Sequence, residues 1–287
     1  MKGKACFCVA LFLWCSVWTV ASTRRALVFG LGQQEDTRWR RIHGDKDVEL
    51  VVQMLVKAGF TDIRTLMNER ATKAGMEQAF MGLISRLERG DVVYVHYSGH
   101  GQFMTDVDGD EAERWTGRHA QWDEAWIPYD AYMTYCERDR GEKHFCDDEV
   151  ARYMQQVRQK VGAEGEVYVV VDACHSGDAT RGVDDECVRG VDVEFMIPRQ
   201  FGTEPAKAVA ETWLTVSACK PYQLCFEHKS PQVGKLTYAL YRLGERLFSM
   251  TNGELQAWLD GYMDANPSRL PQNPVVSGKR CLREKRK

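Results

Sequence analysis

One short apolar run, followed at once by small and polar residues, constrains this chain more than any other stretch. Residues 167–171 read VYVVV and residues 172–177 read DACHSG. A continuous apolar run of this length, four of whose five residues are valine, is typical of a central strand in a parallel sheet, buried on both faces. Such a strand would deliver Cys174 to the carboxyl edge of the sheet, where nucleophiles are often placed. Taken alone, the pattern is equally typical of a buried structural thiol.

The rest of the chain alternates between strand-like and helix-like patterns. Strands are predicted at residues 25–32, 62–66, 91–97, 167–171 and 212–218, with an edge strand at 271–276, and helices at 44–59, 68–87, 147–161, 234–247 and 252–266. This order predicts one α/β domain with a mainly parallel central sheet flanked by helices. Two long polar stretches, 102–146 and 178–211, are predicted as loops, which at this length are usually functional or mobile.

The N-terminus has the pattern of a secretory signal. Lys2 and Lys4 precede an uncharged apolar stretch over residues 6–20, and small residues follow at 21–22. This stretch is shorter than the roughly 20 residues that a transmembrane helix needs. We therefore expect a signal peptide at residues 1–22, cleavage near residues 21–22, and export of a domain at 23–287 with a basic tail and no transmembrane segment. The net charge of −3 and pI near 6.2 give no indication of nucleic-acid binding.

The cysteine count suggests disulfides with one thiol left over. Three of the ten cysteines fall within the predicted signal peptide, and seven remain. An exported chain can pair six of them and leave one free, and an odd thiol is the one to inspect for reactivity. Plausible pairs are Cys136–Cys146, Cys219–Cys225 and Cys187–Cys281, which would leave Cys174 unpaired.

A second motif supplies a partner for Cys174. The strand predicted at 91–97 runs into Ser98, Gly99, His100 and Gly101. Because parallel strands end at the same edge of a sheet, His100 and Cys174 are expected to face one cleft although they are 74 residues apart. A cysteine nucleophile needs such a proton-transfer partner, together with backbone N–H groups for the oxyanion.

These motifs resemble the caspase-like cysteine peptidases, and most of all their metacaspase and bacterial caspase-homologue branch. The matching stretches are HYSGHG at 96–101, WDEAWIPYD at 122–130, DDE at 147–149 and DACHSG at 172–177, and the resemblance spans about residues 25–277. It implies a caspase-hemoglobinase-like fold and peptide-bond hydrolysis through an acyl-enzyme. Cys174 would be the nucleophile and His100 the general acid and base, while the backbone N–H groups of Gly101 and Cys174 would hold the oxyanion.

The resemblance also implies a substrate preference. In the metacaspase pattern, Asp172 and Ser98 line the primary pocket, and Asp47 resembles the third pocket group. A carboxylate there attracts a guanidinium and repels an acidic side chain, so polypeptides with Arg or Lys before the cleaved bond are the expected substrates. The family's nearby cysteine is replaced by Gly44. Like metacaspases, the chain is expected to be a monomer.

The resemblance also suggests that calcium could activate the protein. No cofactor is required for the chemistry, but many metacaspases are activated by Ca²⁺ through acidic loops. Asp123, Asp147 and Asp148 match positions used there, with Asp184 or Asp185 as a fourth ligand. Oxygen ligands suit Ca²⁺, although acids at 147–149 are equally typical of an ordinary helix N-terminus.

Three function classes follow from these observations. The first is an exported endopeptidase that cleaves after Arg or Lys. It would find basic residues beside its own nucleophile, so one of Arg181, Arg189, Arg199 and Lys207 is expected to be a self-cleavage site. The second is a catalytically silent caspase-fold binding module stapled by disulfides. The third is a disulfide-stapled secreted domain in which Cys174 is merely unpaired.

Overall fold

A six-stranded sheet forms the centre of the molecule. The computed structural model describes residues 22–109, 122–174, 187–198, 211–221 and 223–282. The strand order is β2-β1-β3-β7-β8-β9, in which the first five strands are parallel and β9 runs antiparallel to β8. The bounds are β1 Arg24–Gly30, β2 Asp62–Met67, β3 Val92–Ser98, β7 Glu166–Asp172, β8 Leu214–Ser217 and β9 Val275–Gly278.

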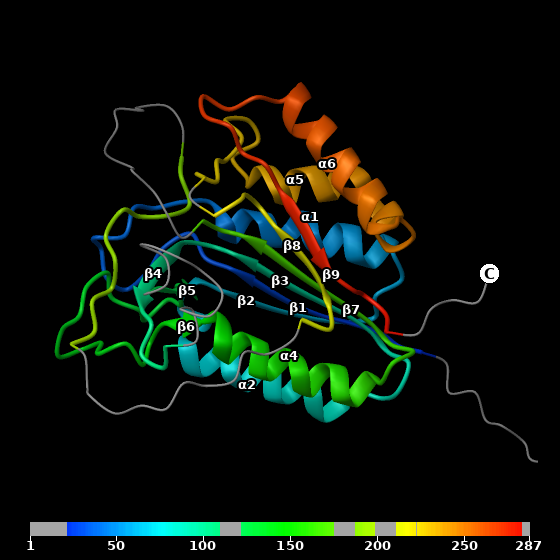
Figure 1. Cartoon of the computed structure of the whole chain (residues 1–287), viewed down its shortest axis with the longest axis horizontal. Helices are drawn as coiled ribbons and strands as arrows, with labels where there is room; N and C mark the ends of the chain where they lie inside the picture. The colour runs from blue at the N-terminus through cyan, green and yellow to red at the C-terminus, as the bar shows by residue number, and fades with distance from the viewer. Residues whose placement is uncertain (1–21, 110–121, 175–186, 199–210, 222, 283–287) are drawn as a thin grey trace, which may run out of the picture.

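Helices cover both faces of this sheet (Figure 1). Side chains alternate between the faces along each strand, and Val28 and Val170 pack toward one side while Phe29 and Val169 pack toward the other. The first side is covered by α1 (Gly44–Lys57), α5 (Lys235–Leu243) and α6 (Asn252–Ala265), and the second by α2 (Lys73–Arg86) and α4 (Asp147–Val161). The predicted fold class, a helix-flanked and mainly parallel α/β sheet, is confirmed.

Two predicted helices are shorter than expected. The pattern at 68–87 is divided into a 3-10 turn, η1 (Asn68–Arg70), and helix α2, which begins after Thr72. The hydroxyl of Thr72 accepts a hydrogen bond from the N–H of Gly75 at 3.1 Å, and this N-cap defines the start of α2. The pattern at 234–247 ends its α-helix at Leu243 and continues as the 3-10 turn η3 (Gly244–Phe248).

The prediction that residues 102–146 form only a loop is wrong. A small antiparallel sheet lies there, with β4 (Gly101–Thr105), β5 (Trp122–Trp126) and β6 (Phe145–Cys146) in that order. It lies at the carboxyl end of the main sheet (Figure 1). Strands this short and polar carry little alternation in sequence, and they become strands only by pairing with one another. Because β4 starts directly after His100, the small sheet forms one side of the candidate site.

The expected disulfides do not form. All seven cysteines in the described part of the chain are free thiols, and the sulfur atoms of Cys219 and Cys225 lie 3.0 Å apart, a hydrogen-bond contact. An odd number of thiols therefore no longer distinguishes Cys174. The predicted signal peptide falls on residues that lie almost wholly outside the described ones. In the described part of the chain, no helix has the length and apolar character to cross a membrane.

Candidate active site

The two motifs singled out in the sequence come together at the carboxyl edge of the main sheet. Ser98 and Asp172 are the last residues of neighbouring strands β3 and β7 and lie opposite each other in register. His100 and Cys174 each follow two residues later, and both are 1% exposed. The parallel register therefore brings a histidine and a cysteine to equivalent positions at one edge, because each continues a strand that ends at the same level.

Hydrogen bonding orients the ring of His100. Its Nε2 lies 2.7 Å from the carbonyl oxygen of Arg40, and because a carbonyl only accepts, Nε2 carries the hydrogen. The other nitrogen, Nδ1, is buried and has no hydrogen-bond partner among the described residues. The ring of Trp39 packs 5.2 Å from that of His100. Burial lowers the pKa of His100 to about 4 and outweighs the hydrogen bond to Arg40, which would raise it. The ring is therefore neutral at pH 7, and Nδ1 is the nitrogen without a hydrogen.

Two backbone N–H groups converge on one carbonyl oxygen beside these side chains. Gly101 and Cys174 both donate to the oxygen of Arg189, at 3.2 and 3.1 Å. Donors that converge in this way are the arrangement that stabilises an oxyanion in acyl transfer. The oxygen they hold belongs to a residue of the same chain, which therefore occupies the site.

The guanidinium of Arg189 lies in a fully buried acidic pocket. Its Nη1 is 2.7 Å from Asp47 Oδ2, 2.5 Å from Ser98 Oγ and 3.6 Å from Asp172 Oδ1, and its Nη2 is 2.9 Å from Glu227 Oε1. The three residues predicted to line a primary pocket for arginine thus surround an arginine. Glu227 is a fourth member that the sequence analysis missed, since no motif marks it.

The N-terminus of α5 holds the carboxylates of this pocket in place. Asp172 Oδ2 accepts hydrogen bonds from the backbone N–H and the hydroxyl of Thr237, at 2.8 and 2.7 Å, and Asp47 Oδ1 accepts from the N–H of Gly234 at 2.9 Å. A Cβ on Gly234 would lie 2.2 Å from Asp172 Oδ2 and 2.6 Å from Arg189 Nη1. The pocket therefore has room for a guanidinium only because position 234 has no side chain.

The charges in the pocket depend on one another. Burial raises the pKa of Asp47 to about 6, and Asp172 adds to the increase while Arg189 opposes it. Burial would lower the pKa of Arg189, but Asp47, Asp172 and Glu227 outweigh it and raise that pKa well above its usual value. Burial likewise opposes ionisation of Glu227, whose pKa is nevertheless lowered by Arg189 and His43. A permanently charged cation thus favours the ionised forms of Asp47 and Glu227.

Gly44, the first residue of α1, lies against the strand ends. A Cβ there would be 2.4 Å from the carbonyl oxygen of Ser98 and 2.5 Å from that of Leu31. The first turn of α1 therefore packs directly on the backbone beneath the pocket. This close packing is what places Asp47, three residues further along α1, against Arg189.

The sequence matches the model of a known protein family. A sequence model described as the caspase domain matches residues 23–271. The chain belongs to the caspase-domain family. The predicted resemblance to caspase-like peptidases is confirmed, and the chain carries a caspase-family peptidase domain.

Named relatives agree with this assignment. Metacaspase-1A of Aspergillus clavatus is 32% identical over 120 residues, which cover 42% of this caspase-domain chain and 24% of that protein. Metacaspase-1 of Coccidioides immitis is 31% identical over 119 residues, covering 42% and 22%. The matched region is thus about a quarter of the length of these curated relatives.

Solved structures show the same fold. A crystal structure of a protein from Geobacter sulfurreducens matches with a TM-score of 0.62 and 21% identity, and covers 90% of this caspase-domain chain and 94% of its own. Caspase-1 of Spodoptera frugiperda matches with a TM-score of 0.56 and 13% identity, covering 90% and 87%. At these identities the likeness is one of fold.

The acidic residues expected to hold calcium lie close together in this caspase-domain protein. Asp123 is in β5, and Asp147 and Asp148 begin α4. Burial and the carboxylates of Asp147, Asp106 and Asp148 raise the pKa of Asp123 to about 9. Its Oδ1 is buried and accepts no hydrogen bond from the described residues. Carboxylates this close repel one another, but among the described residues they do not bring three ligand atoms within 4.8 Å of one another, so calcium binding stays a prediction. Asp184 and Asp185 lie outside the described residues.

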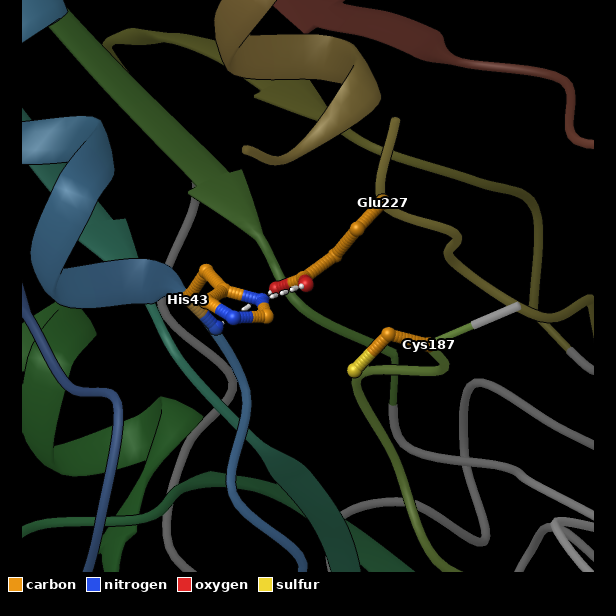
Figure 2. A group of neighbouring side chains, drawn as sticks. All are labelled: His43, Cys187 and Glu227. Atoms are coloured by element: carbon orange, nitrogen blue, oxygen red, sulfur yellow. Dashed lines mark hydrogen bonds and ion pairs between the residues drawn. The ribbon is translucent and has the colours of Figure 1, made fainter. Parts of the chain in front are cut away.

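A different set of possible metal ligands meets more closely. In the described part of the chain, only His43, Cys187 and Glu227 bring three such atoms within 4.8 Å of one another. Figure 2 shows these three side chains, with His43 pointing toward Glu227. His43 Nδ1 is 2.6 Å from Glu227 Oε2, and Glu227 in turn contacts Arg189. Burial and then Glu227 raise the pKa of Cys187 to about 12, so its thiol stays protonated. We interpret the contact between His43 and Glu227 as one that orients the carboxylate of Glu227 toward Arg189.

Proposed function

We propose that this chain is an exported cysteine endopeptidase that cleaves peptide bonds after arginine or lysine. The observation that carries the proposal is the placement of Arg189, whose side chain fills the acidic pocket while its carbonyl oxygen accepts from Gly101 and Cys174. A substrate residue would have to satisfy the same two requirements at once. The export part of the proposal rests on the predicted signal peptide alone.

The chemistry follows from the geometry of His100 and Cys174. Neutral His100, with Nε2–H held by Arg40, takes the thiol proton of Cys174 on Nδ1. The thiolate attacks the carbonyl carbon of the residue in the pocket, and the developing oxyanion is stabilised by the N–H groups of Gly101 and Cys174. His100 then protonates the leaving amine, and water hydrolyses the thioester.

The pocket supports a strong preference for a basic residue. Three carboxylates, from Asp47, Asp172 and Glu227, surround the guanidinium of Arg189, and Glu227 also contacts His43. An acidic residue in this position would meet like charges in a buried site, and an apolar one would leave the three carboxylates without the guanidinium. Lysine would bring the charge but fewer hydrogen bonds than arginine.

Calcium enters as a regulatory proposal. Asp123, Asp147 and Asp148 would hold the ion, which would supply positive charge where burial and mutual repulsion now keep Asp123 protonated. The group lies on β5 and at the start of α4, next to β4. Bound calcium would therefore rigidify the small sheet that begins at Gly101.

A second candidate function is favoured by one observation. Because Arg189 fills the pocket, a chain that never releases it would be a catalytically silent binding module. Hydrolysis assays separate the two. We expect the wild-type chain to cleave fluorogenic peptides that end in Arg or Lys, and to leave peptides that end in Asp uncut.

Controls make the assay decisive. Both Cys174→Ala and His100→Ala are expected to lower kcat/KM for Arg peptides by at least about 10³-fold. The assay is run with and without Ca²⁺, on protein freed of other proteases. Hydrolysis that survives in Cys174→Ala would contradict the proposed mechanism, and the absence of hydrolysis from wild type and from a chain with an emptied pocket would favour the silent module.

A further inference from the structure

We propose that the bond between Arg189 and Gly190 is a self-cleavage site, and that the segment around it blocks the active site of the intact chain. This segment, residues 187–198, is called the strap below. The inference rests on the proposed function and deepens it, because it names the first substrate of the site. Of the four basic residues considered from the sequence, Arg181, Arg199 and Lys207 lie outside the described residues, and Arg189 lies in the pocket.

The N-terminal side of the strap is bound like an added strand. Val188 pairs antiparallel with Phe226, the N–H of Arg189 donates to the carbonyl of Cys225 at 3.0 Å, and the N–H of Glu227 donates to the carbonyl of Cys187 at 3.0 Å. An extended peptide that adds to a free strand edge obtains its affinity from such main-chain bonds. The bonds are independent of side-chain identity, so they would hold any extended peptide.

The C-terminal side of the strap is bound as well. Gly190 and Phe195 form parallel bridges to Gly101 and Met104 of β4, and the N–H of Phe195 donates to the carbonyl of Phe103 at 2.8 Å. The side chain of Phe195 is completely buried. The strap thus crosses the catalytic centre and is anchored on both sides of Arg189, which holds the Arg189–Gly190 bond in place.

The carbonyl group of Arg189 lies where the carbonyl of a substrate would react. Its oxygen receives hydrogen bonds from both proposed oxyanion donors, Gly101 and Cys174, and its side chain is held by all three pocket carboxylates. The next residue, Gly190, has no side chain to obstruct the leaving group. Only residues 175–186 separate Cys174 from the strap, and the contact is made within one chain.

The cleavage step balances with water as the only co-reactant. The thiol proton of Cys174 passes to His100, and the sulfur bonds to the carbonyl carbon of Arg189. The C–N bond to Gly190 breaks, the electron pair stays on nitrogen, and His100 returns the proton to it, which gives a new amino terminus. Water then adds to the thioester carbon, the C–S bond breaks, the sulfur regains a proton, and Arg189 ends in a carboxylate.

Two consequences follow from the placement of the strap. A peptide cannot enter the pocket while Arg189 fills it, so the uncut chain is inactive toward other substrates. Because the bond is held in its own active site, its effective concentration does not depend on the amount of protein. Self-cleavage should therefore follow first-order kinetics. Its rate constant should stay the same when the protein is diluted over a range of about 100-fold.

The test compares four full-length chains by intact-mass spectrometry and by peptide hydrolysis: wild type, Cys174→Ala, Arg189→Lys and Arg189→Gln. Wild type and Arg189→Lys are expected to yield one fragment that ends at residue 189 and one that starts at Gly190, and Cys174→Ala is expected to stay intact. Arg189→Gln is expected to stay uncut at this bond. It should nevertheless hydrolyse short Arg peptides at least about tenfold faster than uncut wild type, since the competing intramolecular ligand is gone.

The outcomes separate this inference from the proposed function. If wild type stays uncut while Arg189→Gln cleaves Arg peptides, the self-cleavage site is overturned and the peptidase proposal stands. If uncut wild type cleaves Arg peptides as fast as Arg189→Gln, the blocking role of the strap is overturned. A cleavage rate that rises with protein concentration would overturn cleavage within one chain. If Arg189→Gln does not fold, the mass of wild type against Cys174→Ala and Arg189→Lys still decides the cleavage site.

Discussion

Arg189 shows how strongly a single residue can control the charge of a buried site. Asp47, Asp172 and Glu227 are all buried, and one guanidinium contacts all three. Removing one partner from such a group leaves another charge buried without compensation, which is more costly than the pair itself is worth. The pocket is therefore sensitive to the loss of any carboxylate, and its affinity for cations is expected to fall steeply.

A first prediction concerns Asp172. Asp172→Asn keeps an oxygen that can accept from Thr237 but removes one negative charge beside the guanidinium. We expect kcat/KM for Arg peptides to fall by about 10²-fold or more, because truncating one side of a buried charge pair costs several kcal/mol. Asp264→Asn, at an exposed position of α6, serves as the control and should leave kcat/KM unchanged. Equal activity of the two variants would contradict the role of Asp172 in the pocket.

A second prediction follows from the raised pKa of Asp123. The unfolded group has a pKa near 3.8 and the folded group one of about 9, so the folded chain binds the extra proton between these values. The stability that this group contributes is full below pH 3.8 and is lost as the pH rises through 9. Asp123→Asn resembles the protonated acid and removes this loss. Without calcium, we expect its melting temperature to exceed that of wild type by at least about 3 °C at pH 9 but not at pH 4.

Calcium supplies the control for this measurement. Added Ca²⁺ should raise the melting temperature of wild type more at pH 8 than at pH 5, because the ion must displace the proton of Asp123. The same addition should have a smaller effect on Asp123→Asn. A melting-temperature difference between the two chains that does not change with pH would refute the raised pKa.

At the level of elements, the start of α5 does more for the site than its sequence suggests. Gly234 is the N-cap residue of α5, and its backbone N–H and that of Thr237 point at two carboxylates of the pocket. The N-terminus of a helix favours nearby negative charge, so α5 provides a suitable place for these two carboxylates. A helix that packs on the sheet through Leu236 and Leu240 thus also organises the pocket around Arg189.

The third prediction uses the lack of a side chain at position 234. Gly234→Ala would place a methyl group in the space of the guanidinium and of Asp172. We expect kcat/KM for Arg peptides to fall by about 10²-fold, and self-cleavage at Arg189 to slow in parallel. Gly261→Ala in α6, where an added Cβ meets nothing within 4 Å, is the matched control and should retain full activity. If Gly234→Ala cleaves Arg peptides normally, the guanidinium of a substrate does not occupy this space.

At the level of the whole molecule, the described residues show little surface of the kind that pairs with a second copy. The edge strand β9 spans only Val275–Gly278, and short edge strands discourage pairing between sheets. The largest exposed apolar side chains lie on separate segments, such as Val56 on α1, Met81 on α2 and Met196 on the strap. Single exposed apolar residues of this kind are ordinary and do not form an interface.

A monomer is therefore the fourth prediction. Light scattering after size exclusion should give the mass of one chain, at most 32.8 kDa, for wild type and for Cys174→Ala alike. Cys174→Ala is the useful control because it cannot cleave itself under the proposed mechanism. A mass of twice this value at micromolar concentration would refute the prediction.

Local patterns in the sequence were enough for the main sheet and for the placement of His100 and Cys174. Val167–Val171 predicted β7, and the ends of β3 and β7 placed His100 and Cys174 at one edge, because parallel strands share their carboxyl edge. The motif around Asp172 and Ser98 likewise identified pocket residues. These features depend on short stretches of sequence, and the resemblance to caspase-like peptidases carried the rest.

Features that depend on distant segments were missed. The small sheet of β4, β5 and β6 has strands too short and polar to be recognised alone, and the expected disulfides rested on a count rather than on positions. Glu227, Gly234 and Thr237 belong to no motif. Gly234 and Thr237 reach the pocket because α5 packs against α1 and β7, and Glu227 reaches it because its backbone pairs with Gly234 and with Cys187.

The sequence by itself determined that Cys174 follows a buried central strand and that acidic residues lie near it, because apolar runs and motifs are local properties. Only the tertiary structure decided which basic residue meets that site. Arg189 reaches the pocket because the strap pairs with residues 225–227 on one side and with β4 on the other. Such pairings join segments far apart in the chain, and their energy appears only once the sheet has folded. In the folded chain, the stretch that predicted a nucleophile at Cys174 therefore lies beside Arg189 of the same chain.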